Sequence, residues 1–473
     1  MMPWNIKIEV FATDALIYLL IIAGVALFFY VHRHEHLRAP WRQIFRRRLA
    51  MASLVTLCVY VVIGLMDSIH YHLPASDVDE SRDVQYSPEV ISFLDYVLTP
   101  LREGVEKTYS APFATHLFAK ETIELPDGTS RRGYPRLSHG GVHLDDPETQ
   151  RLPDIVKTSA VGIFQGVAVS AILALILIAW LARRRQQAVG RTAGDILRGR
   201  TQVPWTVILG TMTVFIILIF LAIQLGAKYH ILGTDKVGQD VFYQTLKSIR
   251  TGLVIGTLTT LVMLPFAILL GIMAGYFRGW VDDMIQYLYT TLSSIPSVLL
   301  IAAMILIVNV FIESHPERYT DVNQQANAKL LFLCIILGIT SWTTLCRLLR
   351  GESLKLREVD YIQAALAFGV GRIKIITRHI LPNVMHIVLI TIVLDFSGLV
   401  LAEAVLSYVG VGVDPSMNSW GNMINSARLE MAREPVVWWS LMAAFIFMFT
   451  LVLSANLFSD AVRDAFDPRI RKL

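Results

Sequence analysis

Long apolar runs separated by short polar segments dominate the pattern along this chain. A run of about 18 or more apolar residues is long enough to cross a bilayer as a helix, because lipid offers backbone amides no hydrogen-bond partner. The pattern predicts about nine such spans, which lie near residues 11–31, 50–67, 158–181, 203–226, 252–275, 285–311, 329–348, 386–408 and 436–458. We therefore expect an all-α, multi-pass membrane protein.

Arginine residues between the spans indicate how the chain is oriented in the membrane. Cytoplasmic loops carry an excess of positive charge, and arginines cluster after the first span and after the third. The clusters are Arg33, Arg38, Arg42, Arg46, Arg47 and Arg48, then Arg183, Arg184, Arg185, Arg191, Arg198 and Arg200. This places the N-terminus outside the cell, and residues 276–283, residues 357–383 and the C-terminal tail in the cytoplasm. The tail agrees, because it carries Arg463, Arg469, Arg471 and Lys472.

Composition supports the same class of protein. Hydrophobic residues make up 54% of the chain and charged residues only 17%, whereas a soluble protein has roughly a quarter charged residues. The net charge of +4 is small, so topology explains the basic residues better than nucleic-acid binding does. The first span lacks a small-residue cleavage site, which favours a retained helix over a signal peptide.

No pattern of ligand residues indicates a metal or a disulfide framework. Cys58, Cys334 and Cys346 lie in or beside apolar runs without CxxC or Cys/His spacing, so we expect them to act as packing residues. His32, His34 and His36 alternate with arginine and glutamate. A helix would spread these histidines around its surface, and the arginines disfavour a cation. A position at the lipid headgroups is the better interpretation.

Residues 357–383 form a polar segment between two predicted spans, and its sequence, REVDYIQAALAFGVGRIKIITRHILPN, is interrupted by glycine and proline. Asp360 can cap a helix and Gln363 can reach back to complete a capping box. Gly369 and Gly371 then allow the chain to turn. A second short helix is expected over 372–380, and Leu381-Pro382 is expected to force a break before the next span.

One face of the first short helix is small and apolar, since Ile362, Ala365, Leu366 and Gly369 follow the i, i+3, i+4, i+7 spacing. Ala364 and Ala365 would let another surface approach closely. From the residues alone, two interpretations stay open. The segment is an amphipathic loop that rests on lipid headgroups, or it is a docking element for a cytoplasmic partner.

The stretch YIQAALAFGVGRIKIITRHILPN (361–383) resembles the EAA loop of permease subunits in binding-protein-dependent ABC importers. The matching residues are Ala364, Ala365, Gly369, His379, Leu381 and Pro382. Gln363 replaces the usual glutamate, which removes a charge but keeps an oxygen. The flanking RHILPN is similar to the oligopeptide/dipeptide/nickel branch of that family.

Further stretches resemble the same branch and follow in the family's order. They are LGTDKVGQDVF (232–242, with Gln239 where arginine is usual), AGYFRGWVDD (274–283), SIPSVLL (294–300), LAEAVLSYVGVGV (401–413), SWGNMI (419–424) and RDAFDPR (463–469). The resemblance covers about residues 200–473 and is greatest to the C-type permeases of peptide importers. It implies a type I ABC importer permease fold.

The N-terminal half departs from the family pattern. We divide the chain into N-terminal transmembrane helices (1–67), an extracytoplasmic insert (68–157), an extra transmembrane helix with a basic cytoplasmic segment (158–200), and the permease core (201–473) with its EAA loop at 357–383. WRQIFRRRLAMASLVTLCVYVVIGL (41–65) looks like the start and first span of such a permease. Either that helix is separated from its neighbours by an insertion, or span 203–226 takes its place.

The resemblance implies a transport subunit of the bacterial inner membrane. Such a permease pairs with a second permease, binds two cytoplasmic ATPases through the EAA loops, and receives solute from an extracytoplasmic binding protein. The chain has no GxxxxGK[ST] phosphate loop, so ATP and Mg²⁺ are expected on the partner ATPases, with no cofactor and no catalytic residue in this chain. The residues implied in coupling are Asp360, Tyr361, Gln363, Ala364, Ala365, Gly369, Gly371, Arg372, Arg378, His379, Leu381 and Pro382.

Two interpretations stay open for the charged residues of the core. Arg372, Lys374 and Arg378 either pair with acidic groups on the ATPase or contact anionic lipid. Asp395 lies within a predicted span, where charges are expensive; it either faces the pathway, where it would meet a cationic group, or makes an interhelical hydrogen bond. Glu403 and Trp420 are placed by the resemblance near the outer gate.

The main alternative function is a transporter or channel that needs no ATPase. That class favours an internal repeat with paired interrupted helices, and no convincing repeat is found in this sequence. Co-purification of an ATPase would distinguish the two functions. The substrate is expected to be a dipeptide, an oligopeptide, nickel or a related small solute.

Overall fold

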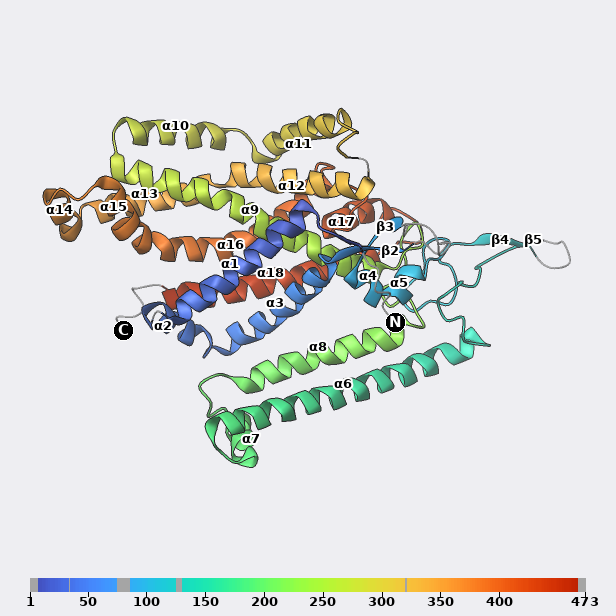
Figure 1. The fold of residues 1–473 in the computed structure, drawn as a ribbon. Coiled ribbons are helices and arrows are strands. Elements are labelled where there is room, and N and C mark those ends of the chain that lie inside the picture. Colours follow the sequence, from blue (N-terminus) through green and yellow to red (C-terminus); the bar gives the residue numbers. More distant parts are fainter. Residues whose placement is uncertain (1–6, 34, 75–85, 125–129, 320, 467–473) are drawn as a thin grey trace, which may run out of the picture. The chain divides into compact units, whose positions relative to one another are not determined.

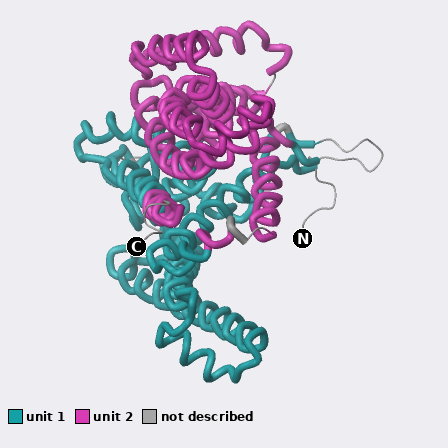
Figure 2. Tube along the Cα trace, turned by 90° about the vertical axis from the view of Figure 1, so that its left-hand side faces the viewer, with its two compact units in different colours: residues 1–9, 42–250, 418–454 teal, residues 10–41, 251–417, 455–473 magenta. Residues whose placement is uncertain are grey.

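The computed structural model describes residues 7–33, 35–74, 86–124, 130–319 and 321–466 (Figure 1). The chain forms two compact units (Figure 2). The first comprises residues 1–9, 42–250 and 418–454, and the second comprises residues 10–41, 251–417 and 455–473. Almost all regular structure is helical, as the apolar runs predict.

The first unit contains the predicted extracytoplasmic insert and several spanning helices. Its elements are β1 (Lys7–Glu9), α3 (Arg48–Asp67), β2 (His70–Pro74), β3 (Tyr86–Ser92), α4 (Phe93–Val97), α5 (Thr99–Glu103), β4 (Glu121–Glu124), β5 (Ser130–Gly133), α6 (Pro147–Arg185), α7 (Val189–Leu197), α8 (Trp205–Gly226), the start of α9 (Val241–Phe277), α17 (Trp420–Glu430) and the first part of α18 (Trp439–Phe466). Strands β1, β2 and β3 form an antiparallel sheet in that order, and β4 pairs with β5 as a hairpin.

The second unit contains the predicted cytoplasmic loop. Its elements are α1 (Ala12–Arg33), most of α2 (Glu35–Ile44), the rest of α9, α10 (Trp280–Ser294), α11 (Ser297–Glu313), α12 (Val322–Ser341), α13 (Thr343–Arg357), α14 (Asp360–Ala367), α15 (Arg372–Ile375), the π-helix η1 (Ile376–Ile380), α16 (Leu381–Tyr408) and the end of α18. Two apolar cores hold this unit together.

Within the described residues, 8 helices are long and apolar enough to span a membrane, and they correspond to eight of the predicted spans. The run near 285–311 is different from the prediction. It forms α10 and α11, which meet at an angle of 87°. Between them Ile295 is extended and Pro296 precedes the first residue of α11. Proline lacks an N–H and disfavours a helical residue before it, so this apolar run is a bent pair of helices, which is either a broken span or a re-entrant loop.

The extra spanning helix α6 packs along α8 in the first unit, and α8 in turn contacts α3. Between α6 and α8 the Gln224 side-chain amide donates to the Gln165 side-chain oxygen at 2.9 Å. Lipid offers these side chains no hydrogen-bond partner, so the two amides of the spanning helices bond to each other. The segment around 158–200 therefore forms a helical hairpin with the span that follows it.

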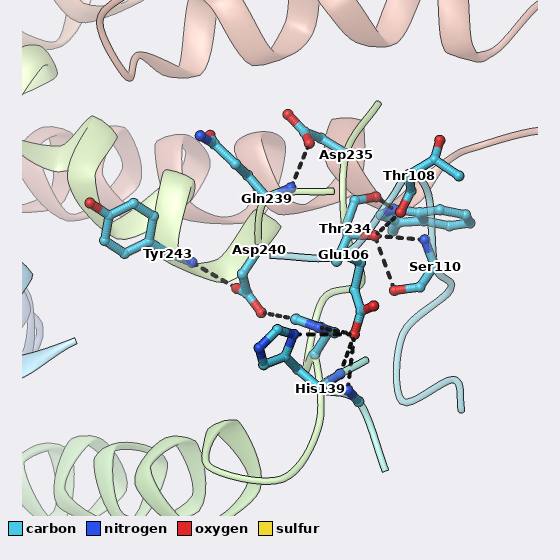
Figure 3. A network of polar contacts seen from close by, with 12 residues as sticks. Glu106, Thr108, Ser110, His139, Thr234, Asp235, Gln239, Asp240 and Tyr243 are labelled. Carbon is cyan, nitrogen blue, oxygen red and sulfur yellow. Dashed lines mark hydrogen bonds and ion pairs between the residues drawn. The ribbon is translucent and has the colours of Figure 1, made fainter. Parts of the chain in front are cut away.

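A buried polar network ties the insert to the LGTDKVGQD motif (Figure 3). The Glu106 carboxylate accepts hydrogen bonds from the backbone N–H groups of Ser138 and His139 at 2.8 Å and of Gly140 at 3.1 Å. His230 lies 3.4 Å from the Glu106 carboxylate through Nε2, and its Nδ1 lies 2.8 Å from Asp240. The two carboxylates thus share one buried imidazole.

Thr234 of the same motif is enclosed by residues of the insert and of α18. Its hydroxyl donates to the Thr108 carbonyl at 2.9 Å and accepts from the Ser110 N–H at 2.7 Å. Its carbonyl accepts from the Trp439 indole N–H at 2.9 Å. At Gly238 a β-carbon would overlap the Glu106 carbonyl. The insert therefore packs against this motif.

The charges of this network shift the pKa values of its members in opposite directions. Burial opposes ionisation of Glu106, but hydrogen bonds from His230 and the three backbone N–H groups outweigh it and lower its pKa to about 2. Burial alone would lower the pKa of His230, yet its hydrogen bonds to Asp240 and Glu106 outweigh it and raise that pKa to about 9. Both groups are therefore charged at neutral pH.

We predict that the stability of the insert is greatest between about pH 4.5 and 6.5, the ordinary pKa values of Glu106 and His230. The contribution of His230, whose pKa is raised, is lost as the pH rises through about 9. The contribution of Glu106, whose pKa is lowered, is lost as the pH falls toward about 2. Thermal unfolding followed by tryptophan fluorescence across this range measures the effect.

The variants His230→Gln and Glu106→Gln serve as controls for this prediction. His230→Gln should flatten the alkaline side of the stability profile, and Glu106→Gln should flatten the acidic side. Equal slopes in the wild-type protein and both variants would contradict the assignment.

Candidate coupling site and membrane carboxyls

The loop that is predicted to be cytoplasmic is built on a close contact between α9 and α13. A β-carbon at Gly271 would lie 2.8 Å from the Cys346 carbonyl oxygen, and one at Gly275 would lie 2.6 Å from the Arg350 carbonyl oxygen. Only glycine lets the two backbones approach this closely. The sequence GIMAG (271–275) carries the small-xxx-small spacing, which is typical of such a close helix contact.

Ion pairs then fix the segment after α9 against α13. The Arg350 guanidinium donates to both carboxylate oxygens of Asp282, at 2.6 and 2.7 Å. Arg278 pairs with Glu358, and Arg357 donates to the Tyr276 carbonyl at 3.0 Å. A bidentate guanidinium–carboxylate pair fixes orientation as well as distance. The AGYFRGWVDD stretch therefore supports the start of the loop.

The start of α14 differs from the predicted capping box. Val359 takes the extended N-cap position and no side chain caps the helix, so Asp360 is the first helical residue. From there Asp360 still favours the positive end of the helix dipole. The Gln363 amide donates to the Arg357 carbonyl at 2.8 Å and does not cap α14. The capping-box prediction is therefore wrong, because the helix begins one residue earlier than it requires.

The end of α14 is the predicted glycine turn. Gly369 has a φ of +76°, a conformation that glycine adopts without strain. Its N–H donates to the Leu366 carbonyl and the Val370 N–H donates to the Ala365 carbonyl, both at 3.0 Å. This pair of bonds is a Schellman motif. The turn is confirmed, and Gly371 follows it as the N-cap of α15.

The small apolar face of α14 packs inward. Ile362 is fully buried, and Ala365 and Leu366 lie against the unit's own core. Ala364 and Gly369 are exposed, so they do not share a face with Ala365. Of the predicted face, Ile362, Ala365 and Leu366 therefore hold the helix to this chain, whereas Gly369 is exposed.

Large apolar side chains stand out from the loop. Phe368 is 87% exposed and Ile373 is 77% exposed, and Tyr361 is also largely exposed. Phe368 directly precedes the Gly369 turn, and Ile373 directly follows the N-terminus of α15. They flank the glycine turn on a segment predicted to be cytoplasmic, where water penalises exposed apolar surface.

The second half of the loop runs without a break into α16. The Leu381 N–H donates to the Ile376 carbonyl, which closes the wide turn of η1, and Pro382 occupies the first turn of α16. The expected break at Leu381-Pro382 is therefore wrong; the residues 372–408 form one continuous candidate span.

Tyr361 connects α14 to this long helix. Its ring lies 6.0 Å from the His379 ring, centroid to centroid. The Asn383 amide donates to the Tyr361 hydroxyl at 3.1 Å and to the His379 carbonyl at 2.6 Å. The contact between Tyr361 and His379 thus holds α14 against the helix that continues into α16.

Comparison with known proteins agrees with this architecture. The sequence profile of the family "Binding-protein-dependent transport system inner membrane component" matches residues 267–472. The chain is 33% identical to the oligopeptide transport system permease protein OppC of Mycobacterium tuberculosis over 248 residues, which cover 52% of this chain and 78% of that protein. The chain belongs to this permease family.

Other relatives have related names. The glutathione transport system permease protein GsiD of Pectobacterium atrosepticum is 32% identical over 244 residues, which cover 51% of this chain and 73% of that protein. The dipeptide transport system permease protein DppC of Bacillus subtilis is 26% identical over 243 residues, covering 51% and 70%. The chain is thus a permease of the oligopeptide/dipeptide branch, C-type, as the motifs predicted.

The basic side chains of the permease's loop are available to a partner. Arg372, Lys374 and Arg378 are exposed, and none of them forms an ion pair within the described residues. Contact of these side chains with an acidic protein surface and contact with anionic lipid both stay predictions.

The three residues assigned to the pathway or gate have different surroundings within their own units. Glu403, in α16, is buried and its carboxylate accepts from the Ser407 hydroxyl at 2.8 Å. Trp420 is buried in the first unit, and its indole N–H donates to the Thr245 carbonyl at 3.2 Å. Both side chains are held by internal contacts. Asp395 is half-buried near the middle of α16.

Some predicted features fall outside the described part of the chain. His34 and the side chain of His36 lie outside the described residues, as do Arg469, Arg471 and Lys472 of the basic tail. Of the three histidines, His32 is described, and its ring stacks on Phe28 at 6.0 Å between centroids. Cys334 and Cys346 are buried within the second unit, whereas Cys58 is exposed.

We predict that Gly275→Val destabilises the permease by about 1–3 kcal/mol, because the added side chain must push α13 away from α9. The matched control is Gly210→Val in the spanning helix α8, where a β-carbon meets no atom within 4 Å. Denaturant titration in detergent measures the free energy of unfolding. Equal losses at the two positions would show that the close contact is not a constraint.

Proposed function

We propose that this permease is one of two membrane subunits of an ATP-driven importer for dipeptides, oligopeptides or a related small solute. The names of its relatives, which are oligopeptide, dipeptide and glutathione permeases, support peptides as the substrate class. The second permease subunit, an extracytoplasmic binding protein and two cytoplasmic ATPases complete the assembly. The bacterial inner membrane is the location that these relatives suggest.

The observation that carries this proposal is the exposed pair Phe368 and Ile373 on a firmly held loop. Their apolar side chains are exposed in the isolated subunit, and burial of apolar surface is the main driving force of association. A groove on the ATPase that receives Phe368 would bury it. Exposed Ala364, beside it on α14, leaves room for that surface.

The basic residues around the turn suit the same partner. Arg372, Lys374 and Arg378 form a positive rim beside the apolar pair. An acidic rim on the ATPase would steer the two subunits together. The proposed interface with the ATPase thus has an apolar centre and charged edges.

Motion reaches the membrane because α14 is fixed on several sides. Its inner face packs on the core, Tyr361 contacts His379, and Glu358 just before it pairs with Arg278. A displacement of α14 by the ATPase is passed to α13 and α16 as a rigid-body movement. ATP and Mg²⁺ act on the ATPase, since this sequence has no GxxxxGK[ST] loop.

Uptake of labelled di- and tripeptides, compared with uptake of nickel, tests the proposal directly. Cells with and without the chain should differ in peptide uptake, and an ATPase should co-purify with the tagged permease. Uptake that persists without any ATPase would favour the alternative, a secondary transporter or channel.

We predict that Phe368→Asp abolishes ATPase co-purification and lowers peptide uptake at least tenfold, because a charge replaces the apolar centre of the contact. The exposed side chain is not needed for folding, so membrane insertion should be normal. The matched control is Leu197→Asp on α7, which is 79% exposed and lies outside the loop. If both variants transport at the wild-type rate, the docking assignment is wrong.

A second prediction concerns Gly369. Gly369→Trp should collapse uptake while the protein still inserts, because the side chain strains the left-handed turn and obstructs the docked surface. Gly369→Asn is the matched control, since asparagine tolerates this conformation and space around the position is open. Uptake and co-purification are measured together. Equal uptake by the two variants would contradict a role for the turn.

A further inference from the structure

Asp395 places a carboxylate deep in a membrane span. It lies in α16 (Leu381–Tyr408), nine residues from the predicted cytoplasmic end of the span at 386 and thirteen from its outer end at 408. At about 1.5 Å of rise per residue, these separations are roughly 14 and 20 Å. A carboxylate at this depth is costly unless it faces water, a cation or a hydrogen-bond donor.

The polar neighbours of Asp395 are engaged elsewhere. The Ser397 hydroxyl donates to the Leu394 carbonyl at 3.0 Å and lies 2.7 Å from the Asn456 side-chain oxygen. The Phe396 ring packs where Gly256 leaves space, 2.5 Å from the position of an added β-carbon. Among the described residues, the Asp395 carboxylate has no hydrogen bond and no ion pair. The interhelical hydrogen bond considered as an alternative is therefore absent from this part of the chain.

Asp395 borders the face of α16 that this chain leaves open. Leu394, Gly398, Leu401 and Val405 are exposed, and their i, i+4, i+7, i+11 spacing puts them on one side of the helix. At Gly398 an added β-carbon would meet no atom within 4 Å. Hydrocarbon against this face would leave the neighbouring carboxylate without a partner. Charge complementarity therefore favours a cation beside Asp395.

We propose that Asp395 lies on the translocation pathway and binds a positively charged group of the peptide in transit, an ammonium or guanidinium. This inference rests on the proposed function, because it takes peptides as the solute. Asp395 attracts the cationic group at mid-membrane, where little water competes, and so favours peptides that carry positive side chains. A cation from the second permease subunit is the competing source, and the experiment separates the two.

The test compares two tripeptides that differ only in their central side chain, lysine or glutamate. Uptake is measured with the complete transporter in proteoliposomes at a saturating amount of binding protein. The readout is the ratio of lysine-peptide uptake to glutamate-peptide uptake. The binding protein is the same for every variant, so its own selectivity cancels when ratios are compared between variants.

We expect Asp395→Asn to lower this ratio about tenfold, as the loss of one charge-assisted hydrogen bond implies. Asp395→Glu should retain the wild-type ratio, and Asp395→Lys should invert the preference. The matched control is Ser397→Ala, which removes a polar group from the same turn that is already bonded internally. This control changes total uptake without changing the ratio.

Three outcomes would overturn the inference. An unchanged ratio in Asp395→Asn with normal uptake shows that Asp395 does not meet the solute. An equal loss of both peptides shows that it pairs with another subunit. Failure of the wild-type transporter to import either peptide overturns the proposed function and this inference with it, whereas normal wild-type import with an unchanged ratio overturns the inference alone.

Discussion

Lipid offers no hydrogen-bond partner, and this constraint decides how polar residues are arranged in both units. Gln165 and Gln224 pair between spanning helices of the first unit. In the second unit the Ser397 hydroxyl lies against Asn456 of α18. Each of these polar groups is satisfied by another from the same unit. Against this rule Asp395 is conspicuous, because its carboxylate lacks such a partner among the described residues.

Hydropathy predicted the spans well because length and apolar content are local properties of the sequence. It missed the bend at Ile295 and Pro296, since a count of apolar residues over 285–311 does not register a proline within the run. Helix ends were also placed too early or too late, as at α9, which begins at Val241 although the apolar run begins near 252. Polar residues can continue a helix beyond the bilayer, and the hydropathy of the apolar run does not indicate that the helix extends so far.

The loop shows which site features a sequence can predict. The turn at Gly369 follows from local backbone chemistry, so it could be predicted. The orientation of α14 could not, because it depends on which face the core of the second unit receives. Ala365 points inward and Ala364 outward, although the two are adjacent in sequence. Phe368 was overlooked for the same reason: only the packed structure shows that its ring is exposed.

The structure of the insert was also not predictable from local sequence, because its contacts join residues that lie far apart in the chain. Glu106 and His230 are separated by 124 positions, and no local pattern indicates that they meet. Once they do, the carboxylate of Asp240 on the other side of the imidazole keeps it charged. The LGTDKVGQD motif is thus held by groups that lie far away in sequence. Contacts of this kind are decided by tertiary packing and not by propensity.

One continuous helix connects the two functional parts of the second unit. Residues 372–408 carry the basic side chain of Arg372 at one end and Asp395 near the middle. The two positions are 23 residues apart in the sequence, which is roughly 35 Å at about 1.5 Å per residue. Because no break occurs at Pro382, the proposed movement of the loop would be passed along this helix. Under the proposed function, a docked ATPase that tilts α14 would move the carboxylate of Asp395, and the proposed cation binding in the membrane would then depend on the nucleotide cycle.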